Sequence, residues 1–408
     1  MAKWHSEVPG PRFVFCLLAH LTFTYDPSRD RPTSSVIGES MPIVQHQELR
    51  RFGYDVFKAA GIPDEDARIV SEHLVHSNLF GHDSHGVIRI ARYIQWLQEG
   101  KVLANQEVKV ILENDMLAIL DGQFGLGQSI GEQAVRIGLD KCSQQGISMV
   151  GLRDAGHLGR IGDWPLMAAR ENKISIHFVN TSGLGLLVAP FGGTERRMST
   201  NPVCIGIPSE DEPSLVLDFA TSIVAEGKVL NALGGGKPLP AGALIDGDGT
   251  LSTDPVLLYG VSDSSQPLDV RTGSGAIRAM GEHKGSGLSF MCEILAGALT
   301  GSGCSTPGKQ QLANGMLSIY IVPEFVTTAD SFAAELRQYV EFFRSARPAE
   351  AGGEVLCPGD TETRHRAQRR ADGVPLPGST WQSLLDVAEE SGMPAAEIEA
   401  ARAAALES

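Results

Sequence analysis

The sequence predicts an α/β protein in which helical segments at the two ends of the chain flank a middle part that is rich in strands. Three features indicate this fold class. Apolar residues recur at helical spacing in residues 44–60 and again within 381–404, whereas residues 180–227 contain short apolar strand patterns joined by Gly and Pro. The composition, 42% hydrophobic and 20% charged over 408 residues, is that of a globular protein with two or three domains.

Helices are predicted where apolar spacing coincides with a start or stop signal. In the first helix, Leu49 and Phe52 share one face. The second begins at Pro63, which favours a first helical turn, and the third follows Asp83-Ser84, either of which can cap a helix. The expected helices cover residues 44–60, 63–79, 84–100, 129–144, 163–171, 284–299, 332–344 and one or two segments within 381–404.

Strands are predicted for the short apolar runs between these helices. They cover residues 108–113, 117–121, 147–152, 174–179 and 316–322, with further short strands between residues 180 and 227. Three consecutive glycines at 234–236 predict a flexible turn.

The first 40 residues are expected to form a poorly ordered extension. Their apolar run at 13–23 faintly resembles a signal peptide. However, His20 interrupts this run, and no small-residue cleavage site follows it.

The net charge and the cysteines limit which partners and which cellular compartment we expect for this protein. A net charge of −15 argues against a general nucleic-acid or anionic-membrane binder, because such binding needs a basic face. None of the six cysteines forms a CxxC pair or has a zinc-finger partner, which favours free thiols in a reducing compartment, so we expect a cytoplasmic protein. No run approaches 18 consecutive apolar residues, so no transmembrane helix is expected.

The densest group of reactive side chains lies within residues 81–93. If a helix starts near Ser84, then His85, Arg89 and Tyr93 recur at every fourth position and share one face. Arg offers a bidentate fork, Tyr a hydroxyl group and His a proton donor or acceptor, so this stripe predicts a carboxylate site. A solvated helix face is the plain alternative.

A second candidate site is the glycine-rich turn at residues 156–162. It follows a predicted strand and precedes a predicted helix, an arrangement that suits a phosphate group. The spacing of its glycines is not that of a Rossmann fingerprint, and no acid ends the next strand. His157 inside the turn suits general acid–base chemistry near neutral pH, or it simply hydrogen-bonds the loop.

Three further segments carry weaker signals. Residues 189–202 contain Gly-Gly and Asn-Pro turns, and residues 217–228 begin with Leu-Asp-Phe-Ala and end with Gly-Lys. Residues 281–287 place Lys284 at a glycine-flanked helix start, where it can hold a phosphate or carboxylate. A capped surface helix is equally compatible with that pattern.

Taken together and in this order, the motifs resemble the malate/L-lactate dehydrogenase family of NAD(P)-dependent oxidoreductases, which is unrelated to the Rossmann-type lactate and malate dehydrogenases. The segments that carry the resemblance are GHDSHGVIRI, GHLGRIGDW, ISIHFVN, APFGGTERRMSTNP, LDFATSIVAEGK and EHKGSGLSFMCEILAGALTG. They belong to a match over about residues 42–405, and the hydroxycarboxylate dehydrogenase branch is the most similar.

The resemblance implies a fold of α+β type. A mainly antiparallel sheet forms a cofactor domain that is not of Rossmann type, and both chain ends build a smaller helical domain. We therefore expect a helical segment at residues 41–115, an NAD(P)-binding domain at 116–330, and a helical segment at 331–408 that packs back on the N-terminal part.

The resemblance also implies a reaction and partners. The cofactor would be NAD, with NADP as the alternative, and the substrate a small 2-hydroxy or 2-oxo acid such as malate or lactate. The protein would be a homodimer with its active site near the subunit contact.

Matching positions imply roles for individual residues. His157 corresponds to the family's proton acceptor, with His85 as the alternative base on the nicotinamide side, and Arg89, assisted by Tyr93, would hold the substrate carboxylate. The positions that match dinucleotide contacts are His85, Gly159, Arg160, Ile161, Val216, Leu217, Asp218, Phe219, Ala220, His283, Lys284 and Gly285, and, by a weaker match in which Asp replaces Glu, Gly359, Asp360, Thr361 and Glu362. No metal ligand is implied.

Two departures and two rival functions stay open. Residues 261–280 look longer than the usual connection in the family and could alter access to the site, and residues 180–183 lie in a loop that bears on substrate choice. An NADPH-dependent reductase of a cyclic imino acid would fit the same fold. A metal-dependent hydrolase or lyase would use a cluster whose spacing matches no standard ligand motif, namely His76, His82, Asp83 and His85.

Overall fold

The computed structural model describes residues 41–183, 185–209, 214–233, 237–260, 271–309 and 311–405. The expected extension at 1–40, the expected turn at 234–236 and the first half of the long stretch at 261–280 lie outside these residues. In the described part of the chain, no helix is long and apolar enough to cross a membrane.

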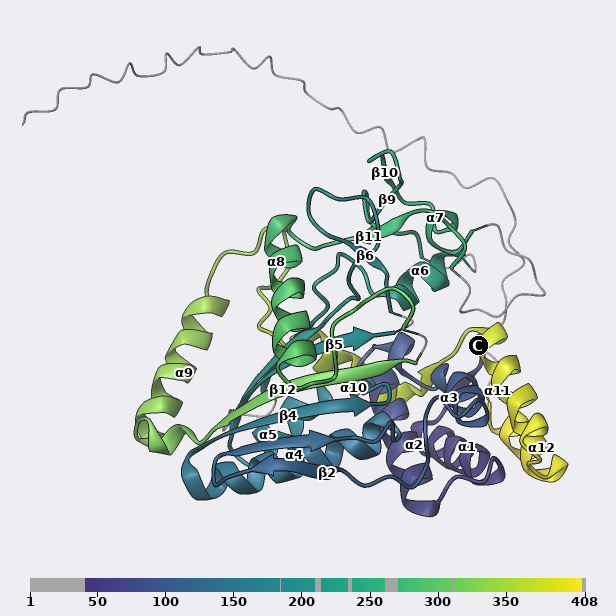
Figure 1. Cartoon of the computed structure of the whole chain (residues 1–408), viewed down its shortest axis with the longest axis horizontal. Coiled ribbons are helices and arrows are strands. Elements are labelled where there is room, and N and C mark those ends of the chain that lie inside the picture. Colours follow the sequence, from purple (N-terminus) through teal and green to yellow (C-terminus); the bar gives the residue numbers. More distant parts are fainter. Residues whose placement is uncertain are drawn as a thin grey trace, which may run out of the picture. The chain divides into compact units, whose positions relative to one another are not determined.

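A seven-stranded sheet forms the centre of the described structure (Figure 1). Its strand order is β2-β3-β4-β12-β5-β7-β8, and every neighbouring pair is antiparallel except β3 and β4. The expectation of a mainly antiparallel sheet is therefore confirmed, in contrast to the parallel sheet of a Rossmann fold. The strands are β2 (Lys109–Glu113), β3 (Leu117–Asp121), β4 (Ile147–Ala155), β5 (Ile174–Ser182), β7 (Val203–Ile207), β8 (Leu215–Phe219) and β12 (Ala313–Ile321).

Helices cover both faces of this sheet, which explains why the middle strand β12 is buried along most of its length. On one face, α4 (Gly127–Gln145) packs against β4 and β12, with Gly138 directly over the Tyr320 ring. On the other face, α8 (His283–Cys292) continues into η2 (Glu293–Ala298), which packs against β12 at Gly315. The short helix α5 (Asp163–Arg170) packs against β5 and β7.

A small lobe is built around a second sheet of strand order β10-β9-β11-β6. It has a separate apolar core that includes Val229, Leu244, Leu258 and Ile277. Its elements are β6 (Val188–Ala189), α6 (Glu226–Leu233), β9 (Leu244–Ile245), β10 (Leu251–Ser252), α7 (Val256–Tyr259) and β11 (Ala276–Arg278).

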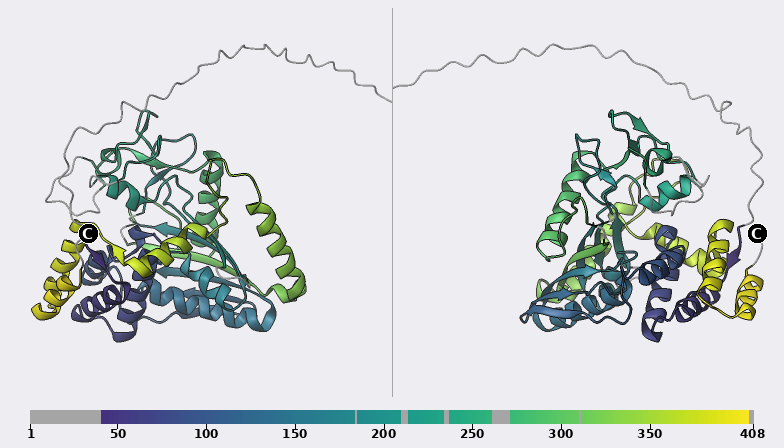
Figure 2. Two further views of the ribbon diagram at one scale, coloured as in Figure 1. Left: turned by 180° about the vertical axis from the view of Figure 1, so that it is seen from behind. Right: turned by 45° about the vertical axis from the view of Figure 1, so that its right-hand side comes forward.

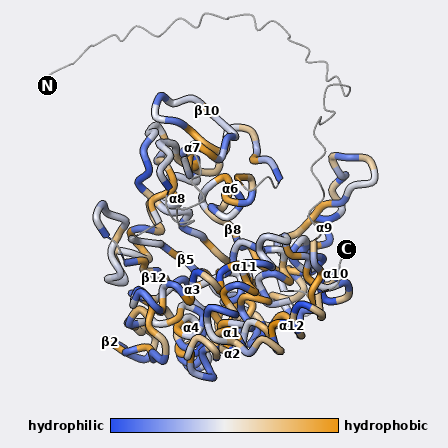
Figure 3. The backbone as a smooth tube through the Cα atoms, turned by 90° about the vertical axis from the view of Figure 1, so that its right-hand side faces the viewer, coloured by the Kyte–Doolittle hydropathy of each residue, from blue (hydrophilic) through white to orange (hydrophobic). Residues whose placement is uncertain are grey.

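Segments from both ends of the chain form a helical part (Figure 2). Its helices are α1 (His46–Ala59), α2 (Asp64–Leu79), α3 (Arg89–Gln98), α10 (Asp360–Asp372), α11 (Gly378–Glu390) and α12 (Ala395–Ala404). The two ends are tied by β1 (Ile43–Val44), which pairs with β13 (Val374–Pro375). Hydrophobic and hydrophilic residues are interspersed along α1, α2, α3, α11 and α12 (Figure 3), and the apolar faces of these five helices share a core that includes Leu49, Leu74 and Trp381. Helix α10 buries none of its residues.

Two expected helices differ from the structure. The helix expected at 84–100 is instead a single 3₁₀ turn, η1 (Asp83–His85), followed by α3, which begins only at Arg89. Gly86 interrupts it with an extended backbone, and a Cβ there would lie 2.2 Å from Oδ1 of Asn78. The helix expected at 284–299 changes from α8 to the π-helix η2 at Glu293.

Candidate active site

The turn at residues 156–162 places His157 between the sheet and the helical part. It connects β4 to α5, and it is held against the first residue of α4: a Cβ on Gly127 would lie 2.1 Å from the carbonyl oxygen of His157. On the sheet side, the backbone N–H of Leu158 donates to Oδ1 of Asn314, at 2.9 Å. Both contacts fix the backbone on either side of the imidazole.

Two side chains from the 81–93 segment meet His157. The Tyr93 hydroxyl lies 2.6 Å from Nδ1 of His157, and the His85 ring stacks on the His157 ring with centroids 5.5 Å apart. The prediction that His85, Arg89 and Tyr93 form a stripe on one helix is wrong, because α3 begins at Arg89. The 3₁₀ turn and the helix nevertheless bring His85 and Tyr93 to the same imidazole.

Arg89 is held at one edge of its guanidinium group. Its Nε donates to the backbone carbonyl of Ser84 at 2.6 Å. Within the described residues, its two terminal nitrogens have no hydrogen bond or ion pair. This leaves the planar fork that binds a carboxylate available at the start of α3.

Burial and the charge of Arg89 set the ionisation of the two imidazoles. Burial, and then Arg89, lower the pKa of His157 to about 3. Burial, His157 and Arg89 lower the pKa of His85 well below its usual range, and burial raises the pKa of Tyr93 to about 12. At neutral pH both imidazoles are therefore uncharged, so the cation of this cluster is Arg89.

The small lobe reaches this cluster through the first turn of α6. A Cβ on Gly227 would lie 2.2 Å from Cβ of Ser84, so α6 packs directly against η1. Glu226 pairs with Arg271 and accepts a hydrogen bond from the Tyr259 hydroxyl at 3.2 Å. Burial opposes ionisation of Glu226, but Arg271 and Arg89 outweigh it and lower its pKa.

Four segments are expected to contact a dinucleotide. One of them contains most of β8, and the other three meet around this strand. In the turn, the backbone N–H of Gly162 donates to the Asp218 carboxylate at 2.9 Å. At the other end of the strand, the N–H of Val216 donates to the carbonyl of Pro358, next to Gly359. Just beyond the strand, the N–H of Met280 donates to the carbonyl of Thr221.

The residues predicted to bind the dinucleotide differ in their exposure and in the partners that they already have. His283 and Lys284 are exposed in the first turn of α8, whereas the Arg160 side chain is buried. Asp360 accepts from the backbone N–H of Cys357 and from Arg344, and Glu362 lies 3.6 Å from His82. Among the described residues, the hydrogen-bond and ring partners of the His157 imidazole are Tyr93 and His85, and neither His283, Lys284 nor residues 359–362 are among them.

The first side chain of α5, Asp163, lies in a buried cluster of charged and polar groups. Asp163 accepts from His73 at 3.0 Å, from His76 at 2.8 Å and from Arg160 at 2.8 Å. The Asp163 carboxylate places negative charge at this helix start, which disfavours a phosphate at that point, and the dinucleotide contact of residues 159–161 stays a prediction. Local spacing could not reveal this buried cluster, because His73 and His76 lie 87 or more residues away from Asp163.

The residues of the alternative metal site face different partners. His76 binds Asp163, His82 faces Glu362, Asp83 pairs with Arg369, and His85 stacks on His157. The described residues contain no group of three or more His, Cys, Asp or Glu that could hold a metal ion.

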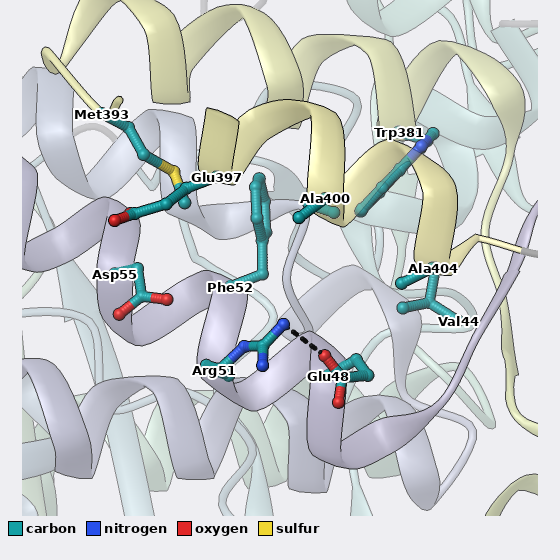
Figure 4. Close-up of a pocket in the computed structure, with 11 residues that line it drawn as sticks. Val44, Glu48, Arg51, Phe52, Asp55, Trp381, Met393, Glu397, Ala400 and Ala404 are labelled. Atoms are coloured by element: carbon teal, nitrogen blue, oxygen red, sulfur yellow. Dashed lines mark ion pairs between the residues drawn. The ribbon is translucent and has the colours of Figure 1, made fainter. Parts of the chain in front are cut away.

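A hollow of about 240 Å³ lies far from this chemistry, between α1, α11 and α12 (Figure 4). Phe52, Trp381 and Met393 line it, and the Glu48–Arg51 ion pair of 2.6 Å stands at its rim. None of its lining residues belongs to the predicted site.

Comparisons with known proteins agree with this architecture. The family model described as malate/L-lactate dehydrogenase matches residues 44–385. Hydroxycarboxylate dehydrogenase B of Escherichia coli O157:H7 is 36% identical over 85% of this chain and 94% of its own length, and L-sulfolactate dehydrogenase of Methanocaldococcus jannaschii is 31% identical over 86% and 98%. The structure of malate dehydrogenase from Pyrococcus horikoshii superposes with a TM-score of 0.75 at 30% identity, covering 86% of this chain and 96% of that one. The chain therefore belongs to the malate/L-lactate dehydrogenase family.

Proposed function

We propose that this protein interconverts a small 2-hydroxy acid and the corresponding 2-oxo acid, with NAD as its cofactor. The observation that carries this proposal is the juxtaposition of an uncharged, partly buried imidazole, His157, with an arginine whose terminal nitrogens are unengaged in the described structure. A 2-hydroxy acid carries a hydroxyl group and a carboxylate on adjacent carbons, and these two groups match the two side chains. When bound, the nicotinamide supplies or accepts the hydride.

The segments around β8 have a donor set that fits a dinucleotide. Gly159 and Gly359 have positive φ values of 74° and 94°, and α8 and α10 both begin beside this strand. Glycines and helix N-termini let backbone N–H groups approach phosphate oxygens. The Asp218 and Glu362 carboxylates favour ribose hydroxyl groups over a 2′-phosphate, which supports NAD over NADP.

Arg89 would bind the substrate carboxylate. Its Nε is already fixed by the Ser84 carbonyl, so binding costs less side-chain entropy than it would for a free arginine. The terminal nitrogens can then donate two parallel hydrogen bonds to the carboxylate.

His157 would exchange the proton with the substrate oxygen. Its Nε2 has no hydrogen-bond partner among the described residues, whereas Nδ1 is engaged by Tyr93. The stacked His85 ring is the alternative proton acceptor.

The test is an assay of the purified full chain with a panel of 2-oxo acids, a cyclic imino acid and both NADH and NADPH. We expect NADH-dependent reduction of at least one 2-oxo acid and weaker binding of NADPH in a fluorescence titration. Turnover of the imino acid alone would contradict the substrate class, and tighter binding of NADPH would contradict the cofactor preference.

We also propose a homodimer, on the basis of exposed apolar side chains. Helix α9 (Ala329–Arg344) stands at the outer edge of the structure (Figure 1) and buries none of its residues. Its apolar side chain Phe342 is therefore 73% exposed. The outer faces of α8 and η2 also expose Phe290 and Ile294. Apolar surfaces of this kind mark protein contacts. Light scattering should give a dimer mass, and Phe342→Glu should lower it, whereas a monomeric wild-type protein would contradict the proposal.

A cytoplasmic location is supported by the thiols. Five cysteines lie in the described residues, and all five are free. Free thiols are typical of a reducing compartment. Cell fractionation should recover the protein with cytoplasmic markers, and recovery in secreted material would contradict this.

A further inference from the structure

Behind His157 lies a buried chain of polar groups that the proposed mechanism does not yet use. The side-chain amide of Gln128 donates through Nε2 to the Tyr93 hydroxyl oxygen at 2.9 Å, and that hydroxyl group lies 2.6 Å from Nδ1 of His157. Gln128 is 1% exposed and Tyr93 3% exposed. The chain therefore runs from α4 through α3 to the turn at 156–162, out of contact with water.

The direction of these hydrogen bonds fixes the tautomer of His157. The phenol has a single hydrogen, and its oxygen already accepts from Gln128, so the hydrogen is left to donate to Nδ1 of His157. A neutral imidazole that accepts at Nδ1 carries its hydrogen on Nε2. In this state His157 offers a hydrogen to the substrate, which suits the carbonyl oxygen of a 2-oxo acid.

The same chain can run in the opposite direction. If Nδ1 of His157 donates to the phenol oxygen, the phenol can donate to Oε1 of Gln128 once the amide has turned over. Oε1 is buried and has no hydrogen-bond partner in the described structure, so the turn exchanges the bond from Nε2 to the phenol for a bond from the phenol to Oε1 and breaks no other. Nε2 of His157 then offers a lone pair, which suits the hydroxyl group of a 2-hydroxy acid.

We propose that Tyr93 and Gln128 are positioning residues that let an uncharged His157 present a hydrogen to a 2-oxo acid and a lone pair to a 2-hydroxy acid. The proposal rests on the proposed function and goes beyond it, because it assigns Tyr93 to the imidazole rather than to the substrate carboxylate. It also gives a role to Gln128, which no sequence motif marked.

The protons balance without a stored positive charge on the imidazole. In the reducing direction, the hydride goes to the carbonyl carbon, the Nε2 proton goes to the carbonyl oxygen, and the phenol proton moves to Nδ1. Once the product has left, a proton from water in the substrate site binds Nε2 of His157, and the Nδ1 proton returns to the phenol oxygen. The reverse sequence releases that proton during oxidation. Burial and Arg89 disfavour a charged imidazole here, and the positive charge of Arg89 lowers the cost of the transient Tyr93 phenolate, which burial opposes.

Two variants test the chain by kinetics. Tyr93→Phe removes the donor to Nδ1, and Gln128→Leu removes the group that orders the phenol. We expect kcat to fall at least tenfold in Tyr93→Phe and about threefold to tenfold in Gln128→Leu, with the KM for NADH unchanged, because each loses a buried hydrogen bond. Matched controls are Tyr54→Phe, whose phenol binds Asp64 outside the site, and Gln133→Leu, which lies on α4 but faces residues 106–108. Both should keep wild-type kcat.

A third variant distinguishes a switchable chain from simple packing. Gln128→Glu offers an acceptor but no donor, so it should favour the lone pair on Nε2 of His157. The KM for the 2-oxo acid should then rise several-fold, while the KM for the 2-hydroxy acid stays the same or falls. An equal rise in both constants would contradict the reversal.

Nitrogen NMR of histidine-labelled protein gives a readout that does not depend on turnover. In the wild type, His157 should give the signals of the Nε2-protonated tautomer, and Tyr93→Phe should mix the two tautomers, with His157→Asn used to assign the resonance. The proposal is overturned if Tyr93→Phe leaves the tautomer of His157 unchanged and also leaves kcat unchanged in both the reducing and the oxidising direction. A wild-type protein without any dehydrogenase activity would instead refute the proposed function, while the tautomer measurement would still decide the role of Tyr93.

Discussion

Replacement of Gly127 by Ala tests whether the catalytic turn must rest directly on α4. Gly127 is the first residue of α4, and a Cβ there would lie 2.1 Å from the carbonyl oxygen and 2.3 Å from the carbonyl carbon of His157. An ordinary contact begins at 3.4 Å, so the turn must move by about 1.3 Å. Both partners are backbone atoms, which cannot rotate away as the end of a side chain can.

A shift of that size should affect the reaction more than the fold. A misplacement of about 1 Å in a reacting group can cost about 10²-fold in rate, and overpacking costs about 1–3 kcal/mol of stability. We therefore expect the kcat for a 2-oxo acid with NADH to fall about 100-fold in Gly127→Ala. The free energy of unfolding in urea should fall by no more than about 3 kcal/mol.

The matched control is Gly247→Ala. Gly247 is exposed in the small lobe, and a Cβ there would meet no atom within 4 Å, so kcat and stability should stay at wild-type values. If Gly127→Ala keeps kcat within twofold of the wild type, then the turn tolerates displacement. The packing argument for the position of His157 would be refuted.

Two further predictions concern charged groups. Arg89→Lys keeps the charge but loses the planar fork, so kcat/KM for the oxo acid should fall about 10- to 100-fold. The affinity for NADH in a titration should change little. Weaker NADH binding with an unchanged kcat/KM would instead make Arg89 a cofactor residue. Burial alone would lower the pKa of His73, but hydrogen bonds to Asp163 and Glu132 outweigh it and raise this pKa to about 9. The stability from this raised pKa is fully present below about pH 6.5 and is lost as the pH rises through 9. Urea unfolding should show that loss in the wild type and not in His73→Gln, and parallel pH profiles would contradict it.

Local sequence patterns were sufficient for most of the secondary structure. The strand at 117–121 and the helices predicted to start at residues 63 and 163 lie within one residue of where apolar spacing and helix-start signals predicted them. The errors occurred where a distant side chain decides the backbone. Asn78 accepts from the N–H of Val87 and fills the space beside Gly86, which delays α3 by several residues.

The π-helix has a similar cause. The buried Glu293 carboxylate, at the start of η2, accepts hydrogen bonds from the side chains of Asn180, Asn201 and Ser305. These partners come from three other parts of the chain. A pattern within residues 284–299 therefore could not reveal the change of helix type.

For the candidate site, the sequence provided residue types but not directions. His157, His85 and Tyr93 form one cluster, yet nothing in the spacing indicated that the phenol would face an imidazole. Gln128 and Asp163 belong to no motif, because their importance depends on burial and on partners from other elements.

The most direct test of the central claim is the turnover of His157→Ala, measured with the best 2-oxo acid and NADH, together with an NADH titration of the same protein. If His157 exchanges the proton with the substrate oxygen, turnover should fall by about 10²–10⁴-fold, because general acid–base help is lost, while NADH binds as in the wild type. Turnover close to that of the wild type would contradict the account and would transfer the role to His85.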